Sequence, residues 1–463
     1  MANKLKNDRD AAAMLYECSP TDDKYRQLKS RFRKRLLNTL FFLDINLPNT
    51  SNYDRAYYSC NKDWTLVKIL LSNDADHTAS TLARQILTIA LKFKFADVIV
   101  NCSRILRAYA VVEDDEKMYE QYDQYSKQFQ DVLDAEIRSE ELFQRVIMNY
   151  HKPQERDALS EKIDTYCEAL KGLSDIYDSP IIIYNKYLVL AYRNEMMEDY
   201  EAVVEVCTAA ENYIVANPLY YQDGMVSTFQ VKKMSAYFHL RDFTNCKIDA
   251  ERFLQGCQQG SDIWFELMEY YVLTALQTEN YLAALSILRK AKSHTRFPKL
   301  MGAIHEKWNV IEIYLNFIVE TQAVRNPTYL AQRSKTFKVS KFLTDPILLP
   351  KEYRILTIQM IIGQILFFLD KKNFTAATER IEKLKLYATR QLKREEHFRA
   401  IQFIRLIQQL PKSEYNPEEF GNTDKYLSRL VANPMQYRGL IHELEFIPYE
   451  KIWEMMLEMI NNK

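Results

Sequence analysis

Apolar residues recur along most of this chain with the three-to-four-residue spacing of amphipathic helices. Several of these stretches open in the same way, with Asp or Asn directly before an aromatic residue. The copies are EDYEAVVEVCTAA from Glu198, RDFTNCKIDAERF from Arg241, ENYLAALSILRKA from Glu279 and KNFTAATERIEKL from Lys372. The shared pattern predicts one helical building block that is used several times.

The polar residue before each aromatic is a good helix N-cap, because its side-chain oxygen can accept from the free N–H groups of the first turn. The predicted caps are Asp199, Asp242, Asn280 and Asn373. The aromatic residues that would then begin the helices are Tyr200, Phe243, Tyr281 and Phe374. Small or medium side chains three positions further on, such as Ala284, would let two helices approach closely.

The aromatic residues of successive copies are 43, 38 and 93 positions apart. The last interval is much longer, so a further copy is expected near its middle, where Asn326 precedes Pro327 at a first helical position. A weaker copy is expected from Lys92, with Lys94 in place of the cap. An apolar partner helix precedes each cap, and these are expected at 181–196, 225–240, 263–277, 304–321 and 353–369.

Helix, tight turn and helix at this spacing indicate an all-α protein of stacked helix pairs. The pattern resembles tetratricopeptide repeats over residues 178–391, although these copies are longer than the family's repeat and usually lack its small first-helix residue. The matching positions in one copy are Tyr187, Leu190, Ala191, Tyr200, Val203, Ala210 and Pro218. The resemblance implies a right-handed α-solenoid whose first helices line a groove for a protein or peptide.

Four regions are expected along the chain. Residues 1–112 form an N-terminal helical region, 113–177 a long antiparallel helical hairpin, 178–411 the repeats and 412–463 a C-terminal cap. A coiled-coil dimer is the alternative for the hairpin, but its apolar spacing is not a sustained heptad. Residues 441–447, IHELEFI, alternate apolar and polar side chains as a short strand would, and a final helix is expected at 449–459.

The composition supports long helices. The 463 residues include only 8 Gly and 13 Pro, which argues against many-stranded β folds and Gly-rich nucleotide folds. Seven cysteines without a CxxC pair favour reduced thiols and a cytoplasmic protein. No apolar window is expected to reach the roughly 18 residues of a membrane span, and 361–369 comes nearest.

The stretch from Tyr25 to Ile45 begins with basic residues and ends with apolar ones. We expect its apolar end to be buried on the first helical layer, and a membrane-surface helix is the weaker alternative.

No motif predicts catalysis, a cofactor or a metal. The seven histidines stand singly, and none lies in HExxH or another paired metal-ligand spacing. GxGxxG, P-loop and GxSxG motifs are absent from the sequence. We therefore expect a protein that is not an enzyme and needs no cofactor.

The resemblance implies which side chains face the groove. They are Asn185, Tyr192, Thr228, His239, Glu266 and Glu269. Asn185 is the preferred residue, because a side-chain amide can hold the backbone of an extended peptide. The alternative is a surface asparagine without a partner.

Charge is unevenly distributed although the total is zero. Residues 113–211 carry 24 acidic and 10 basic side chains, and residues 324–413 carry 18 basic and 7 acidic ones. The two regions could face each other, or the basic third could bind an acidic protein. It could also bind nucleic acid, with nearby aromatic rings stacking on bases. The basic patch comprises Arg333, Lys335, Lys338, Lys341, Arg390, Lys393, Arg394 and Arg399.

Together these observations predict a non-catalytic intracellular scaffold that binds a protein or peptide partner. A peptide-responsive regulator acting through a partner and a nucleic-acid binder remain as alternatives. The sequence leaves the oligomeric state open.

Overall fold

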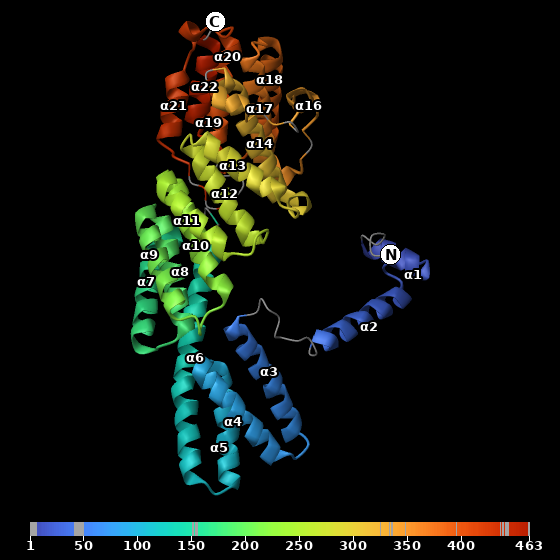
Figure 1. Cartoon of the computed structure of the whole chain (residues 1–463), viewed down its shortest axis with the longest axis vertical. Helices are drawn as coiled ribbons and strands as arrows, with labels where there is room; N and C mark the ends of the chain where they lie inside the picture. Colours follow the sequence, from blue (N-terminus) through green and yellow to red (C-terminus); the bar gives the residue numbers. More distant parts are fainter. Residues whose placement is uncertain are drawn as a thin grey trace. The chain divides into compact units, whose positions relative to one another are not determined.

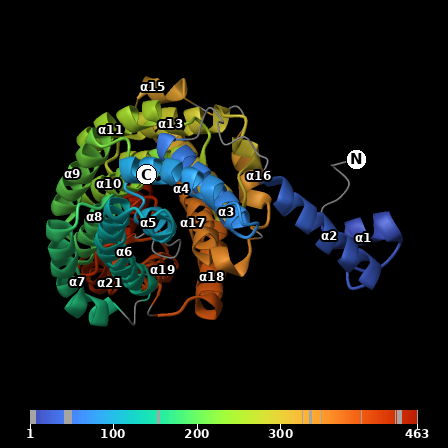
Figure 2. The ribbon, with the colours of Figure 1, turned by 90° about the horizontal axis from the view of Figure 1, so that it is seen from below.

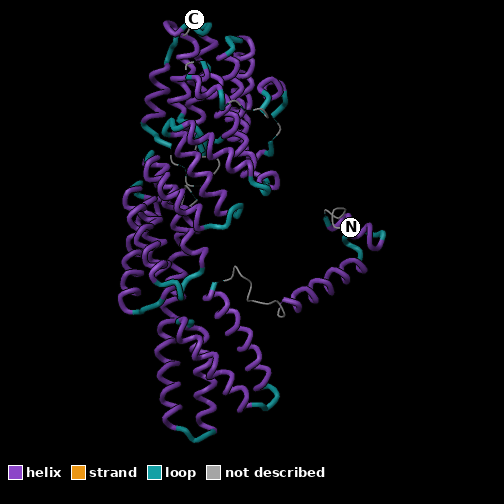
Figure 3. Tube along the Cα trace, in the orientation of Figure 1, coloured by secondary structure: helices purple, strands orange, loops and turns teal. Residues whose placement is uncertain are grey.

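The computed structural model describes residues 7–40, 51–150, 152, 156–324, 326–332, 334, 337–347, 349–394, 396–435, 437, 439 and 444–461. In these ranges all regular structure is helical and no strand occurs (Figure 3). The prediction of an all-α protein is confirmed.

The chain divides into two compact units. The first comprises Met1–Glu141, Gly172–Ile183 and Ala216–Asp223, and the second comprises Leu142–Lys171, Tyr184–Val215 and Gly224–Lys463. Each is described by itself.

The first unit has its core in three helices that follow one another along the chain. Its helices are α1 (Asp8–Tyr16), α2 (Asp23–Leu40), α3 (Asn52–Leu71), α4 (Asp76–Phe93), α5 (Ala96–Val112) and the first part of α6 (Glu116–Tyr150). Helix α4 packs between α3 and α5. The rings of Tyr53, Tyr57 and Phe93 surround Phe95 with centroid distances of 5.1 to 5.5 Å.

Helix α2 packs against α1, where the Tyr25 hydroxyl donates to Asp8 and Lys29 pairs with the same carboxylate. Its second half is accessible to solvent: Phe32 is 62%, Leu36 49% and Leu37 51% exposed. The expectation of a buried apolar end is therefore wrong for residues 32–39, all of which are exposed. Residues 41–45 lie outside the described ranges.

The second unit is a succession of helix pairs, coloured green to red in Figure 1. Its elements, some sharing their ends with the first unit, are α7 (Arg156–Ile176), α8 (Pro180–Met196), α9 (Tyr200–Ala216), α10 (Asp223–Leu240), α11 (Phe243–Gly256), α12 (Asp262–Gln277), α13 (Tyr281–Ser293), α14 (Gly302–Ala323), α15 (Pro327–Leu330), α16 (Val339–Thr344), α17 (Arg354–Asp370), α18 (Phe374–Gln391), α19 (Phe398–Ile407), α20 (Gln409–Lys412), α21 (Thr423–Val431) and α22 (Tyr449–Asn461). In Figure 2, α9, α11 and α13 lie outside α8 and α10.

The predicted building block is present at four places. Tyr200, Phe243, Tyr281 and Phe374 are the first residues of α9, α11, α13 and α18. The side chains of Asp199, Asp242 and Asn373 each accept a hydrogen bond from the third backbone N–H after them. Asn280 does not, because its side-chain amide instead donates to Thr278. The cap prediction is thus correct at three positions and wrong at one.

The turn before each of these helices has one backbone geometry. The residue before the cap is left-handed, with φ of 58° at Glu198, 53° at Arg241, 59° at Glu279 and 55° at Lys372. The cap N–H then reaches back five residues, as Asn280 does to the Ala275 carbonyl at 2.8 Å. This is the Schellman motif, which satisfies the last carbonyls of a helix. The first unit repeats it at Asp74, Lys94 and Asp114, where φ is 56° to 58°.

The copy expected at Asn326 is reduced to one turn. Asn326 caps α15 by accepting from the Thr328 N–H, but α15 has only four residues. Helix α14 therefore packs directly on α17. The two approach at Gly363, where a Cβ would lie 2.7 Å from a methyl carbon of Ile313.

Helix α17 belongs to the core of the second unit. With its preceding turn it spans Lys351–Asp370. Within the described ranges, this is the one helix whose length and composition would allow it to cross a membrane. The expectation that no stretch is long enough was therefore wrong. Its apolar window is 72% buried inside the protein, as in a core helix.

The expected strand at 441–447 is also corrected. Its described part, 444–447, contains no strand, and residues 441–443 lie outside the described ranges. Leu444, Glu445, Phe446 and Ile447 are all at most 3% exposed, so both sides of the segment are buried against helices. The alternation of apolar and polar residues here therefore does not indicate a sheet with one solvent-exposed face.

Candidate functional site

A pocket of about 300 Å³ opens on α8, α10 and α12, which are the first helices of successive helix pairs in the second unit. We call it the tyrosine pocket, because five tyrosine rings line it: Tyr150, Tyr192, Tyr200, Tyr270 and Tyr437. Four of the six predicted groove residues are also in its lining: Tyr192, Thr228, His239 and Glu266. The resemblance to a repeat family thus selected residues that the fold brings together.

Helical periodicity explains why α10 supplies most of one wall. Thr228, Lys232, Ser235 and His239 follow one another at intervals of four, three and four residues, so they share a helix face. Helix α12 contributes Ile263, Glu266 and Tyr270 by the same spacing, and α8 contributes Tyr192 and Glu195.

A buried ion pair forms part of this lining. The Lys232 ammonium lies 2.7 Å from Glu195 Oε2, which also accepts from the Tyr150 hydroxyl at 3.1 Å. The same ammonium lies 3.4 Å from the centre of the Tyr192 ring. Burial works to lower the pKa of Lys232, but the Glu195 carboxylate outweighs it and the net direction is upward. Lys232 is therefore a cation whose charge is already neutralised.

A second carboxylate, Glu269, is also satisfied. It is buried, pairs with Lys307 and accepts from the Tyr437 hydroxyl at 3.3 Å. Tyr437 is fixed further by its carbonyl, which lies 2.7 Å from His239 Nε2. The His239 ring stacks on Tyr200 with centroids 4.2 Å apart and planes 6° apart. Glu269 thus supports the pocket through Tyr437 rather than lining it.

Glu266 differs from both. Its side chain is accessible at the pocket wall and makes no hydrogen bond or ion pair with any described residue. Desolvation by the walls, then repulsion from Glu269, raise the pKa of Glu266 above its usual value. Among the described lining residues the charges of Glu195 and Lys232 offset each other, and Glu266 is the carboxylate left without a partner.

Asn185, the preferred groove residue, lies elsewhere. It is in α8 but only 5% exposed, and it is not part of the pocket lining. The role foreseen for its amide is performed by two glutamines of other first helices. Gln277 Nε2 of α12 donates to the Glu445 carbonyl at 2.8 Å. Gln359 Nε2 of α17 lies 3.5 Å from the Leu444 carbonyl and 3.0 Å from the Tyr449 hydroxyl.

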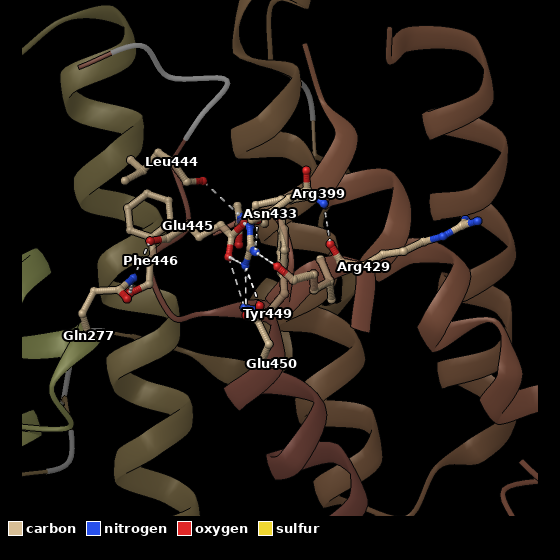
Figure 4. A network of polar contacts seen from close by, with 11 residues as sticks. Gln277, Arg399, Arg429, Asn433, Leu444, Glu445, Phe446, Tyr449 and Glu450 are labelled. Atoms are coloured by element: carbon tan, nitrogen blue, oxygen red, sulfur yellow. Dashed lines mark hydrogen bonds and ion pairs between the residues drawn. The ribbon is translucent and has the colours of Figure 1, made fainter. Parts of the chain in front are cut away.

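Side-chain amides of two first helices thus contact backbone carbonyls of residues 444–446 of the chain itself, and Figure 4 shows Gln277 beside them. Sequence reasoning missed both glutamines. The available signal was an amide inside an apolar run, as at Gln359, or at its end, as at Gln277, since a buried polar group needs a partner.

The predicted basic patch is not one surface. Arg399 is partly buried, with its side chain 14% exposed, and its guanidinium donates to Glu445, Glu450 and the carbonyls of Leu430 and Asn433 at 2.5 to 3.0 Å (Figure 4). Its assignment to a nucleic-acid surface is therefore wrong, because every side of the guanidinium is used. Arg390, Lys393 and Arg394 are exposed near the end of α18, and Lys393 pairs with Glu396.

Lys338 and Lys341 line a different pocket, together with Glu306, Glu312 and Asp345. The nearby rings of Phe337 and Phe342 pack on the hydrophobic core. Arg333 and Lys335 lie outside the described residues.

Nothing within the described ranges gathers three or more His, Cys, Asp or Glu side chains in a metal-binding group. Comparison with protein-family models, with curated proteins and with solved structures finds no match for this chain.

Proposed function

We propose that the second unit is a tetratricopeptide-like, right-handed solenoid that binds an extended segment of a partner protein along its first helices. The protein would then act as a non-catalytic cytoplasmic scaffold. One observation carries the proposal: on this face the Gln277 amide already donates to a backbone carbonyl of the chain itself, that of Glu445 at 2.8 Å, and the Gln359 amide lies 3.5 Å from that of Leu444. Backbone recognition of this kind accepts many sequences, and pockets beside it select side chains.

The tyrosine pocket supplies such a selective position. It lies on α8, α10 and α12, and α12 also carries Gln277. Tyr437, from the chain's own C-terminal part, forms one of its walls. The backbone-holding amides and the open pocket are therefore parts of one set of first helices.

The first alternative, a regulator that responds to a peptide, would use the same pocket and differ only in its output. We do not extend the proposal to nucleic acid, because Arg399 is occupied by carboxylates and the rings of Phe337 and Phe342 pack on the core.

Selection from a library of displayed random peptides tests the proposal. Enriched peptides should bind the wild-type chain, and Thr228→Arg, which fills the pocket from an exposed position on α10, should weaken binding at least roughly tenfold. Glu205→Arg, at an exposed position on α9 outside the pocket, is the matched control and should leave the dissociation constant unchanged. Failure to enrich any peptide, or equal binding by the Thr228→Arg variant, would refute the proposal.

A further inference from the structure

The charges and rings of the tyrosine pocket point to a particular chemistry of ligand. We propose that the pocket takes a basic side chain, lysine or arginine, of the bound segment, with Glu266 as its counter-ion. This inference rests on the proposed function and adds the chemical class that the pocket selects.

The first argument is the state of the three carboxylates. Glu195 is neutralised by Lys232, and Glu269 is neutralised by Lys307 and also accepts from Tyr437. Only Glu266, among these three, has no partner within the described residues. Glu266 faces the pocket as an exposed carboxylate without a partner, so an entering cation could pair with it without displacing a cation already present.

The second argument is the composition of the walls. A cation over the face of a tyrosine ring is attracted by the negative charge of its π-system. The pocket already contains one such pair, because the Lys232 ammonium lies 3.4 Å from the Tyr192 ring centre. Tyr200 and Tyr270 provide further ring surface next to Glu266 on α12 and its neighbours. The aliphatic part of a basic side chain would pack on these rings while its charged end reaches the carboxylate.

The third argument excludes an anion. Lys232 is the lining cation that could attract one, but its charge is used by Glu195 at 2.7 Å. His239 Nε2 lies 2.7 Å from the Tyr437 carbonyl oxygen, so this nitrogen donates within the protein. Among the described lining residues, an acidic side chain would meet the carboxylate of Glu266 without an unpaired lysine or arginine to offset the repulsion.

Size is consistent with a side chain. A volume of about 300 Å³ lies at the lower end of the range for small-molecule sites. Such a space admits one long side chain and not a folded element. The serine and threonine hydroxyls of Ser227, Thr228 and Ser235 are in the lining and can accept from an ammonium or guanidinium.

Saturation-transfer NMR with two matched probes tests the inference without any selected peptide. The probes are N-acetyl-lysine methylamide and N-acetyl-norleucine methylamide, which differ in charge and little in length. We expect signal transfer to the ε-methylene of the lysine probe only, and loss of that signal in Glu266→Gln. Glu205→Gln, on the outer helix α9, should retain it. Equal transfer to both probes, or an unchanged signal in Glu266→Gln, would overturn the inference.

A peptide from the library selection provides the second test. Replacing its basic residue by norleucine, or Glu266 by Gln, should each weaken binding roughly 10- to 100-fold, as expected for a charge-assisted contact. Binding with both changes together should be little weaker than with either change alone, because both remove the same interaction. Additive losses, or tight-binding peptides without a basic residue, would overturn the inference while leaving peptide binding by the second unit established.

Discussion

Removing the Arg399 guanidinium is expected to weaken the C-terminal part of the second unit severely. Arg399→Met keeps the aliphatic length and deletes the charge. Glu445 is only 3% exposed and would remain as a buried carboxylate without its cation. The carbonyls of Leu430 and Asn433, which accept at 2.7 and 2.6 Å, would lose their donor at the same time.

The magnitude follows from this geometry. Breaking a buried ion pair by removing one partner costs about 3–5 kcal/mol, far more than the net value of the pair, because the remaining charge stays desolvated. Arg399 sits between two carboxylates, since Glu450 also accepts from it at 2.9 Å. We therefore expect the free energy of unfolding of this region to fall by about 4 kcal/mol at neutral pH. Arg394→Met, on an exposed side chain nearby, should change it by less than about 0.5 kcal/mol.

The cost should depend on pH with a definite sign. Burial raises the pKa of Glu445 even in the wild type, and loss of Arg399 raises it further. An acid whose folded pKa is raised destabilises the fold above that pKa and ceases to do so once protonated. The deficit of Arg399→Met should therefore shrink as the pH falls from 8 to 5, and Arg399→Met/Glu445→Gln should recover part of it at pH 8.

Urea unfolding gives the overall loss, and hydrogen exchange of the backbone amides of residues 444–461 gives the local one. Exchange in this stretch should accelerate in Arg399→Met and stay unchanged in Arg394→Met. Wild-type protection in Arg399→Met at pH 8 would show that the network in Figure 4 does not hold the segment, and our reasoning about Glu445 would be refuted.

Three further predictions concern the turns, a buried acid and the thiols. Arg241→Gly should raise the free energy of unfolding by about 1 kcal/mol, because φ is 53° there and a side chain is strained in this region; an unchanged or lower urea midpoint would contradict this. Burial raises the pKa of Glu136 to about 7, from an unfolded value of about 4.3. Glu136→Gln should therefore stabilise the first unit by up to about 3 kcal/mol at pH 8 and have little effect near pH 4. Equal unfolding curves of the two proteins at pH 8 would exclude a buried charge. Burial raises the pKa of Cys102, Cys207 and Cys246 to about 12, so iodoacetamide should label these thiols only when the protein unfolds. Labelling of these cysteines in the native protein, mapped by mass spectrometry, would show that their helices open readily.

The helical building block was predictable because its signals are local. A cap, an aromatic start and an apolar face all lie within one stretch of sequence, so the starts of α9, α11, α13 and α18 follow from it. The three matching turns of the first unit were harder, because none of Asp74, Lys94 and Asp114 is followed by an Asp or Asn and then an aromatic residue. The backbone hydrogen bonds, not the residue types, define those turns.

Residues brought together over long distances were predictable only in part. Tyr192, Thr228, His239 and Glu266, which the resemblance places in a groove, line one pocket because they lie on neighbouring faces of α8, α10 and α12. It could not show that Glu195 and Lys232 neutralise each other, nor that Tyr437 completes the wall. Those pairings depend on tertiary packing, as does the burial of Arg399, whose composition-based assignment to a basic surface was wrong.

The wall that Tyr437 forms has a consequence for when the protein can act. Its contact with His239 joins residues 198 positions apart, so the tyrosine pocket is complete only after Tyr437 has been synthesised and has folded against α10. A nascent or truncated chain that ends before Tyr437 contains α8, α10 and α12 but lacks this wall. Under the proposed function, a chain that stops before Tyr437 should therefore bind a ligand in this pocket more weakly than one that includes it.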